Sequence, residues 1–289
     1  ISAKFNEPRG ITTDGTNLYV AEYENHTIRK IEISSGIVTT LAGSAGINGS
    51  FDGTGISARF KQPSGIVTDG TNLYVSDTFN HTIRKIEISS GIVTTLAGSA
   101  GITGSFDGTG ISARFNTPLG ITTDGSSNLY VAEYGNHTVR KIVISSGVVT
   151  TLAGSAGSTG SSDGTGISAK FNTPMGITTD GMNLYVVDSK NHTIRKVVIS
   201  SGVVTTLAGS AGSTGSSDGT GISAKFNRPY QLTTDGINLF VSDFKNHTIR
   251  KVVISSGVVT TLAGSAGNSG TTNAAGTSAR FYGPNRSYH

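Results

Sequence analysis

The sequence predicts an all-β fold made of five consecutive, near-identical units, each a small antiparallel sheet. Phenylalanines recur at intervals of 55 or 56 residues; they are Phe5, Phe60, Phe115, Phe171, Phe226 and Phe281. The composition agrees, because 40 glycines among 289 residues are typical of many short strands joined by tight turns. The absence of cysteine excludes a disulfide framework, a thiol enzyme and a cysteine-based metal site.

Four strands can be placed in order within each unit, here shown for the second. Runs rich in β-branched and aromatic residues predict strands at 65–68, 73–76, 82–88 and 92–97. The breaks Asp-Gly-Thr-Asn and Ser-Ser-Gly between them are short and turn-like. Such links join antiparallel neighbours, whereas a parallel crossover needs about a dozen residues or more. Each unit is therefore predicted to be a four-stranded meander.

Apolar residues on both faces of each sheet predict how the units stack. In the third strand of the first unit, Ile28 and Ile31 point to opposite faces by parity. Radial stacking buries both faces of every sheet, which is the β-propeller arrangement. We expect a single domain over 1–289, with repeats at approximately 5–59, 60–114, 115–170, 171–225 and 226–280 and a decaying tail at 281–289.

The repeated text resembles one family of propeller repeats. It contains Pro-x-Gly-Ile, Asn-Leu-Tyr-Val, Asn-His-Thr-Ile-Arg-Lys-Ile, Thr-Thr-Leu-Ala-Gly and the lead-in Asp-Gly-Thr-Gly-Ile-Ser-Ala-Arg-Phe. This is similar to the long-loop NHL repeat, named for an Asn-His-Leu triplet that reads Asn-His-Thr here, and the resemblance covers 1–284. Family members usually close with six blades. This chain contains five full four-strand units, and 278–284 copies 2–8, so the two copies would compete for one place in a closed five-bladed ring. Five blades are favoured here, and a six-bladed ring with one blade missing or supplied otherwise is the alternative.

Differences among the copies predict a binding surface. In an up-and-down blade, the connection into the first strand and the loop between the second and third strands emerge at the same edge. The copies differ mainly there, whereas the opposite edge is nearly uniform. Exposed aromatic and basic residues in these loops are typical interface anchors, although loops also vary by neutral drift. The predicted ligand-binding face comprises Arg9, Tyr23, Glu24, Ser64, Phe79, Leu119, Tyr134, Met175, Lys190, Tyr230, Phe244 and Lys245.

The repeated histidines raise a metal hypothesis, because a lyase similar to this family binds zinc through histidines. They are His26, His81, His137, His192 and His247. Each begins the third strand of its unit, so histidines of neighbouring blades should lie too far apart to reach the roughly 2.0 Å needed for zinc. We expect them to stabilise turns, and we predict no metal site.

Two repeated sets of carboxylates are also expected to be structural. One set follows each second strand and should accept backbone N–H bonds or face Arg29 and its copies; it comprises Glu22, Asp77, Glu133, Asp188 and Asp243. The other precedes glycine in each lead-in and is expected to form turns; it comprises Asp52, Asp107, Asp163 and Asp218.

The distribution of charge and of apolar residues limits the partners. Arg29, Lys30 and their copies recur with the blades around the periphery, so the net charge of +4 is not concentrated as in a nucleic-acid binder. No apolar run approaches the roughly 18 to 20 residues of a membrane span. The start at Ile1 favours a processed form or part of a longer chain. The composition, with few charges and abundant Gly, Ser and Thr, favours an extracellular or cell-surface protein of bacterial type.

These patterns predict a non-catalytic binding or scaffolding propeller that presents its varied loops to a protein, peptide or glycan. Catalysis needs a constellation that breaks the symmetry of the repeat, and the varied loops contain no His, no Cys and few carboxylates. We therefore predict no catalytic residues and no cofactor. A lyase- or lactonase-like propeller enzyme with a metal on the axis is one alternative, resting on the fold alone. A structural spacer module of a larger surface repeat protein is the other.

Overall fold

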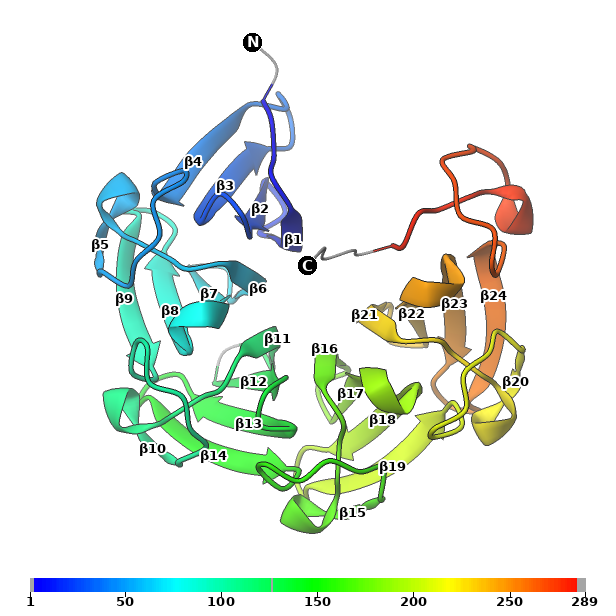
Figure 1. Cartoon of the computed structure of the whole chain (residues 1–289). Coiled ribbons are helices and arrows are strands. Elements are labelled where there is room, and N and C mark those ends of the chain that lie inside the picture. The colour runs from blue at the N-terminus through cyan, green and yellow to red at the C-terminus, as the bar shows by residue number, and fades with distance from the viewer. Residues whose placement is uncertain (1–2, 126, 285–289) are drawn as a thin grey trace. The chain divides into compact units, whose positions relative to one another are not determined.

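The computed structural model describes residues 3–125 and 127–284, and the regular structure there is five antiparallel sheets with short 3-10 turns. The first sheet contains β1 (Pro8–Thr13), β2 (Asn17–Glu22), β3 (Thr27–Glu32) and β4 (Val38–Gly43), side by side in chain order (Figure 1). The second contains β6 (Pro63–Thr68), β7 (Asn72–Asp77), β8 (Thr82–Glu87) and β9 (Ile92–Ala97), and the short β5 (Gly53–Thr54) pairs with the edge of β9.

The other three sheets repeat the arrangement of the second. The third contains β10 (Gly108–Thr109), β11 (Pro118–Thr123), β12 (Asn128–Glu133), β13 (Thr138–Val143) and β14 (Val148–Ala153). The fourth contains β15 (Gly164–Thr165), β16 (Pro174–Thr179), β17 (Asn183–Asp188), β18 (Thr193–Val198) and β19 (Val203–Ala208). The fifth contains β20 (Gly219–Thr220), β21 (Pro229–Thr234), β22 (Asn238–Asp243), β23 (Thr248–Val253) and β24 (Val258–Gly264).

Two kinds of 3-10 turn recur between the strands. One kind follows the short strand of each lead-in: η1 (Gly55–Ser57), η3 (Gly110–Ser112), η4 (Gly166–Ser168), η6 (Gly221–Ser223) and η8 (Gly276–Ser278). The other kind lies between the second and third strands of three blades: η2 (Thr78–Asn80), η5 (Ser189–Asn191) and η7 (Phe244–Asn246).

The five sheets confirm the predicted all-β propeller of five blades, with one addition. The first sheet has the four predicted strands, but each of the others has a fifth, two-residue strand at its outer edge. Gly-Thr has little intrinsic strand preference, and Gly53 pairs with Val93, forty residues away. No local pattern could therefore reveal this strand.

The chain divides into two compact units, each with its own core. The first unit comprises Ile1–Asn136 and Arg140–Thr150, and the second comprises His137–Val139 and Thr151–His289. In the first unit, Tyr19 and Ile28 of the first sheet are buried in one cluster with Phe60 of the lead-in and Leu73 of the second sheet. The second unit buries the matching residues Tyr185, Ile194, Phe226 and Leu239.

Candidate functional site

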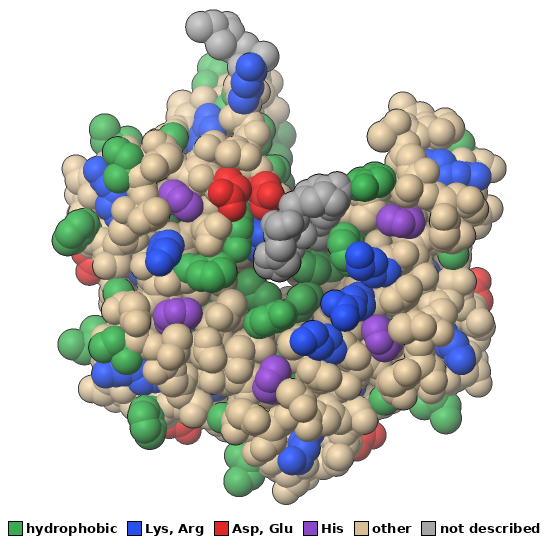
Figure 2. Space-filling model, in the orientation of Figure 1, with side chains coloured by type: hydrophobic (Ala, Val, Ile, Leu, Met, Phe, Trp, Pro, Cys, Tyr) green, Lys and Arg blue, Asp and Glu red, His purple; other side chains and the backbone are tan. Residues whose placement is uncertain are grey.

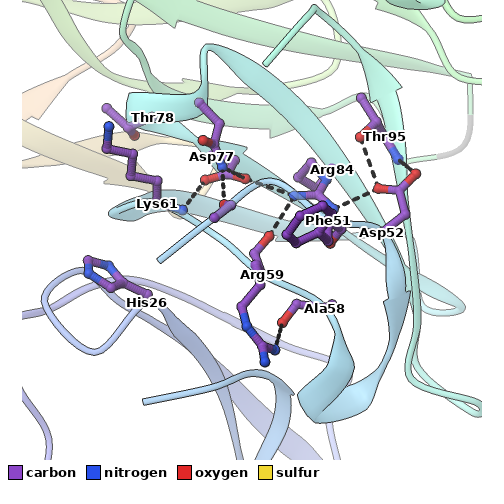
Figure 3. A network of polar contacts seen from close by, with 12 residues as sticks. His26, Phe51, Asp52, Ala58, Arg59, Lys61, Asp77, Thr78, Arg84 and Thr95 are labelled. Carbon is purple, nitrogen blue, oxygen red and sulfur yellow. Dashed lines mark hydrogen bonds and ion pairs between the residues drawn. The ribbon is translucent and has the colours of Figure 1, made fainter. Parts of the chain in front are cut away.

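A buried carboxylate at the end of each second strand holds the varied loops in place, as Figure 3 shows for the second blade. Asp77 Oδ1 accepts a bond from the backbone N–H of Lys61 at 2.7 Å. Its Oδ2 accepts bonds from Asn80 Nδ2 at 2.7 Å and from Arg84 Nη1 at 2.9 Å. One carboxylate thus ties together the connection into β6, the loop after β7 and strand β8.

We call this buried carboxylate with its arginine and N–H donors the buried frame. The buried frame recurs in the other blades, as predicted for these carboxylates. The pairs, with N–O distances of 2.9–3.0 Å, are Glu22–Arg29, Glu133–Arg140, Asp188–Arg195 and Asp243–Arg250. Burial raises the pKa of Asp77, Asp188 and Asp243 to about 6, while the arginine and the N–H donors oppose this rise. These pairs position the loops and are shielded from any ligand.

The arginines differ from the expectation that they are peripheral cations. The Arg84, Arg140, Arg195 and Arg250 side chains are fully buried, so they add nothing to a basic surface. The lead-in aspartates also do more than form turns. Asp52 Oδ1 accepts bonds from Arg84 Nη2 at 2.7 Å and from Thr95 Oγ1 at 3.0 Å, across more than thirty residues of sequence.

Each repeated histidine links its own blade to the connection that enters the next blade. His26 adopts a left-handed conformation (φ 59°), and its Nδ1 accepts the backbone N–H of Gln62 at 3.2 Å. The same bond joins His81 to Thr117, His137 to Thr173, His192 to Arg228 and His247 to Gly283. The histidines therefore stabilise turns, as predicted, and they also connect blades, which the sequence pattern could not show.

The residues that donate these N–H groups, and the equivalent residue of the first blade, carry backbone strain when they are not glycine. Glu7, Gln62, Thr117, Thr173 and Arg228 each precede a proline and have φ between 48° and 55°. Residues other than glycine rarely adopt this conformation, and such strain clusters at functional sites. The copies differ at these positions, so different side chains share one left-handed backbone conformation.

The structure confirms that the two varied loops of each blade share one edge. The backbone N–H of Tyr23 donates to the carbonyl of Glu7 at 3.1 Å, and that of Phe79 donates to Lys61 at 3.1 Å. In the second unit, Lys245 N–H donates to the Asn227 carbonyl at 3.0 Å.

In the first unit, the varied residues satisfy one another. The Arg9 guanidinium lies 3.0 Å from the centroid of the Tyr23 ring and pairs with Glu7 at 3.4 Å. Gln62 Nε2 donates to Glu24 Oε1 at 2.9 Å. Acidic side chains on this surface lie over β1 and its surroundings in Figure 2. Because Arg9, Glu7 and Glu24 are already engaged by neighbouring side chains, few of the charged groups on this surface remain available to bind a ligand.

The expectation of exposed aromatics is wrong for Tyr23. Its exposed fraction is 7%, because it lies beneath Arg9 and meets the Phe79 ring edge-on, with centroids 6.3 Å apart. Ser64 is buried as well, and its hydroxyl accepts a bond from Arg9 at 3.4 Å. Leu119 and Tyr134 in the first unit and Met175 in the second are half-buried.

In the second unit, the varied residues form a basic surface around two aromatic rings. Tyr230 and Phe244 have ring centroids 6.3 Å apart, and Lys245 Nζ lies 5.0 Å from the Phe244 centroid. Lys190, Arg228 and Lys245 are exposed, and none of them forms an ion pair with a residue that the structure describes. Figure 2 shows basic side chains gathered over β21 and β16 of this unit. We call Lys190, Arg228, Tyr230, Phe244 and Lys245 the basic loop surface.

The uniform turns at the other edge have a structural explanation. Asp14 Oδ1 accepts the backbone N–H groups of Thr16 and Asn17, and its Oδ2 accepts the Tyr19 hydroxyl at 2.7 Å. Although burial opposes the shift, these bonds hold the pKa of Asp14 below its ordinary value. The motif is fully used in forming the turn, so its uniformity indicates no ligand.

Among residues 3–125 and 127–284, no group of three or more His, Cys, Asp or Glu side chains could hold a metal ion. No helix in the same residues is long and apolar enough to cross a membrane.

The blades, their inter-blade histidines and the repeated buried frame define a β-propeller built from tandem repeats. The chain belongs to the NHL-repeat β-propellers. It is 31% identical over 294 residues to NHL repeat-containing protein 2 of Homo sapiens, an alignment that covers 89% of this chain but only 40% of that protein. The chain thus spans less than half the length of this relative. No protein-family model matches the chain.

Solved structures share the fold at low identity. A chain in the crystal structure of a nidogen/laminin complex matches with a TM-score of 0.62 and 17% identity, covering 87% of this chain and 79% of that one. The streptogramin B lyase structure matches with a TM-score of 0.60 and 12% identity, covering 90% and 70%. One propeller comes from a protein complex and the other from an enzyme, so the shared fold does not choose between binding and catalysis.

Proposed function

We propose that this chain is a non-catalytic binding module and that its basic loop surface binds an acidic segment of a protein or peptide. The observation that supports this most is a set of three exposed cations beside the contacting rings of Tyr230 and Phe244, none of which pairs with an acidic group of the described residues. Aromatic anchors and arginine are enriched at the centres of interfaces, and unpaired cations favour a partner of opposite charge.

The varied loops also favour binding over catalysis. Their carboxylates Glu7 and Glu24 are engaged by Arg9 and Gln62 in the first unit. The varied loops of the second unit contain no carboxylate, histidine or cysteine. Composition further supports a place outside the cell or at its surface, which fractionation of the source cells would test.

Binding can be measured by fluorescence anisotropy with a labelled synthetic peptide rich in Glu that carries one Tyr, beside the same peptide with Lys in place of Glu. The full chain should bind the acidic peptide alone, and Tyr230→Ala with Phe244→Ala should weaken binding about tenfold or more, the loss of roughly 1.4 kcal/mol or more that is typical of interface anchors. A matched control replaces Met182 and Ile237, which are 73% and 70% exposed in the uniform turns. Equal binding of both peptides, or equal loss in the control, would refute the proposal.

A further inference from the structure

The outer edge of the first sheet differs from that of the other four. In the second blade, Gly53 and Thr54 pair with Val93 and Ile92 at the edge of β9. Short strands pair in the same way with β14, β19 and β24. The first sheet ends at β4, which has no such partner in the part of the chain that the structure describes.

Among the described residues, two polar side chains beside β4 also lack the hydrogen-bond partner that the equivalent side chains have in the second blade. In the second blade, the Asp52 carboxylate accepts bonds from Arg84 Nη2 at 2.7 Å and Thr95 Oγ1 at 3.0 Å. Arg29 and Thr40 occupy the corresponding positions of the first blade. Neither Arg29 Nη2 nor Thr40 Oγ1 has a hydrogen-bond partner within residues 3–125 and 127–284.

Side chains of the first repeat are also more exposed than the equivalent side chains of the second repeat. The Arg29 side chain is 14% exposed, against 0% for Arg84. Phe5 is 39% exposed, whereas Phe60, its counterpart in the next repeat, is fully buried. The first blade thus has an uncovered strand edge, an arginine with unused donors and a partly uncovered aromatic ring in one place.

We propose that the β4 edge and Arg29 form a docking site for an extended segment of the Asp-Gly-Thr-Gly type. The segment adds a strand to β4, as β5 does to β9, and its aspartate pairs with Arg29 and Thr40. Charge selects this occupant, because Arg29 Nη2 lacks, among the described residues, the second carboxylate that Asp52 supplies to Arg84 Nη2. The final glycine is required because its counterparts Gly55 and Gly110 have φ of 54° and 55°.

A second copy of this chain fits this site poorly. Its Asp-Gly-Thr-Gly segments are already paired with their own blades through Asp52, Asp163 and Asp218, among others. The corresponding segment before η8 reads Asn273-Ala274-Ala275-Gly276, which lacks the carboxylate. The occupant is therefore an Asp-Gly-Thr-Gly segment that is not already paired with a blade of its own.

The test places a copy of residues 50–55 (Ser-Phe-Asp-Gly-Thr-Gly) before Ile1, because Ile1 to Pro8 align with Ile56 to Pro63. Amide hydrogen exchange of β4 and the thermal midpoint are compared with those of the unextended full chain. The extension should slow exchange at β4 at least tenfold, to the level of β9, and raise the midpoint. The same extension with Asn in place of Asp should lose most of both effects, as should Arg29→Met in the extended chain.

Two results would overturn the proposal. One is equal protection of β4 by the Asp and Asn extensions, or protection by neither. The other is an unextended chain in which β4 is already protected as well as β9, because another element would then occupy the edge. The Asn extension leaves every residue of the chain unchanged, so it decides the matter even if Arg29→Met fails to fold.

Discussion

At the scale of single residues, the buried Asp77–Arg84 pair carries much of the local order. Both side chains are fully buried, and Arg84 also bonds the carbonyls of Arg59 and Phe51 at 2.9 and 3.1 Å. Removing one partner of such a pair leaves the other charge buried without compensation, which costs about 3–5 kcal/mol.

Arg84→Met should therefore destabilise the protein by about 3–5 kcal/mol in urea unfolding. Arg29→Met is the matched comparison, because it also leaves a buried carboxylate, Glu22, uncompensated, but Arg29 has no counterpart among the described residues of the Arg84 bonds to Phe51 and Asp52. Its loss should be clearly smaller. Equal losses for the two variants would mean that the lead-in contacts of Arg84 add nothing.

The inter-blade histidines predict a dependence of stability on pH. Burial, and next the nearby charge of Lys61, lowers the pKa of His81 below 6.5. A depressed histidine pKa means that the unfolded chain takes up the proton first, so this contribution is complete above pH 6.5 and is lost as the pH falls. Protonation also removes the Nδ1 acceptor from Thr117 N–H.

As the pH falls from 7.5 to 5.5, the free energy of unfolding of His81→Asn should rise relative to that of the unchanged protein, because the variant loses no histidine contribution at this position. Asparagine tolerates the left-handed backbone at this position, where φ is 60°. Asp77, Asp188 and Asp243, whose pKa values are raised to about 6, act with the opposite sign, since their contribution falls as the pH rises through 6. The comparison therefore uses the difference between the two proteins at each pH. Parallel curves would show that His81 does not titrate with folding.

At the scale of the elements, the glycine at or just after the end of each fourth strand sets how closely the next lead-in approaches. A Cβ on Gly98 would lie 2.5 Å from the His81 carbonyl oxygen and 3.0 Å from Phe115 Cδ2. Gly101, three residues later, also has a positive φ, but apart from its chain neighbours no described residue has an atom within 4 Å of its Cβ position. The two positions separate backbone strain from steric contact.

Gly101→Ala should cost about 1–2 kcal/mol, the penalty of the left-handed backbone alone. Gly98→Ala should cost a further 1–3 kcal/mol, because the added methyl group meets backbone and a buried ring. Thermal unfolding of the two variants beside the unchanged protein measures both. Similar midpoints for the variants would contradict the close approach.

At the scale of the whole molecule, the repeat brings like residues to equivalent places without joining them into a metal site. The described residues contain no cluster of metal ligands, and the sequence has no cysteine. Removal of divalent metals with a chelator should therefore leave the thermal midpoint unchanged. A fall that zinc or calcium reverses would contradict this and favour the metal-dependent enzyme.

The sequence alone determined the five blades, the four main strands of each and the edge at which the varied loops meet. Period, turn residues and β-branched runs are local signals, and each is repeated five times. The predicted strands at 73–76 and 92–97 lie within β7 and β9 as observed. The structural role of Asp77 and its counterparts was also predictable, because a carboxylate before an Asn-His turn faces arginine four positions after Asn.

Only the tertiary structure decided which varied side chains remain available. Tyr23 and Phe244 occupy equivalent positions of the repeat, yet Tyr23 is buried beneath Arg9 whereas Phe244 is only half-buried. The contact between the Tyr23 and Phe79 rings joins loops of different blades, as does the bond from Gln62 to His26 across 36 residues. Burial and pairing depend on such distant neighbours, which a repeat pattern cannot specify.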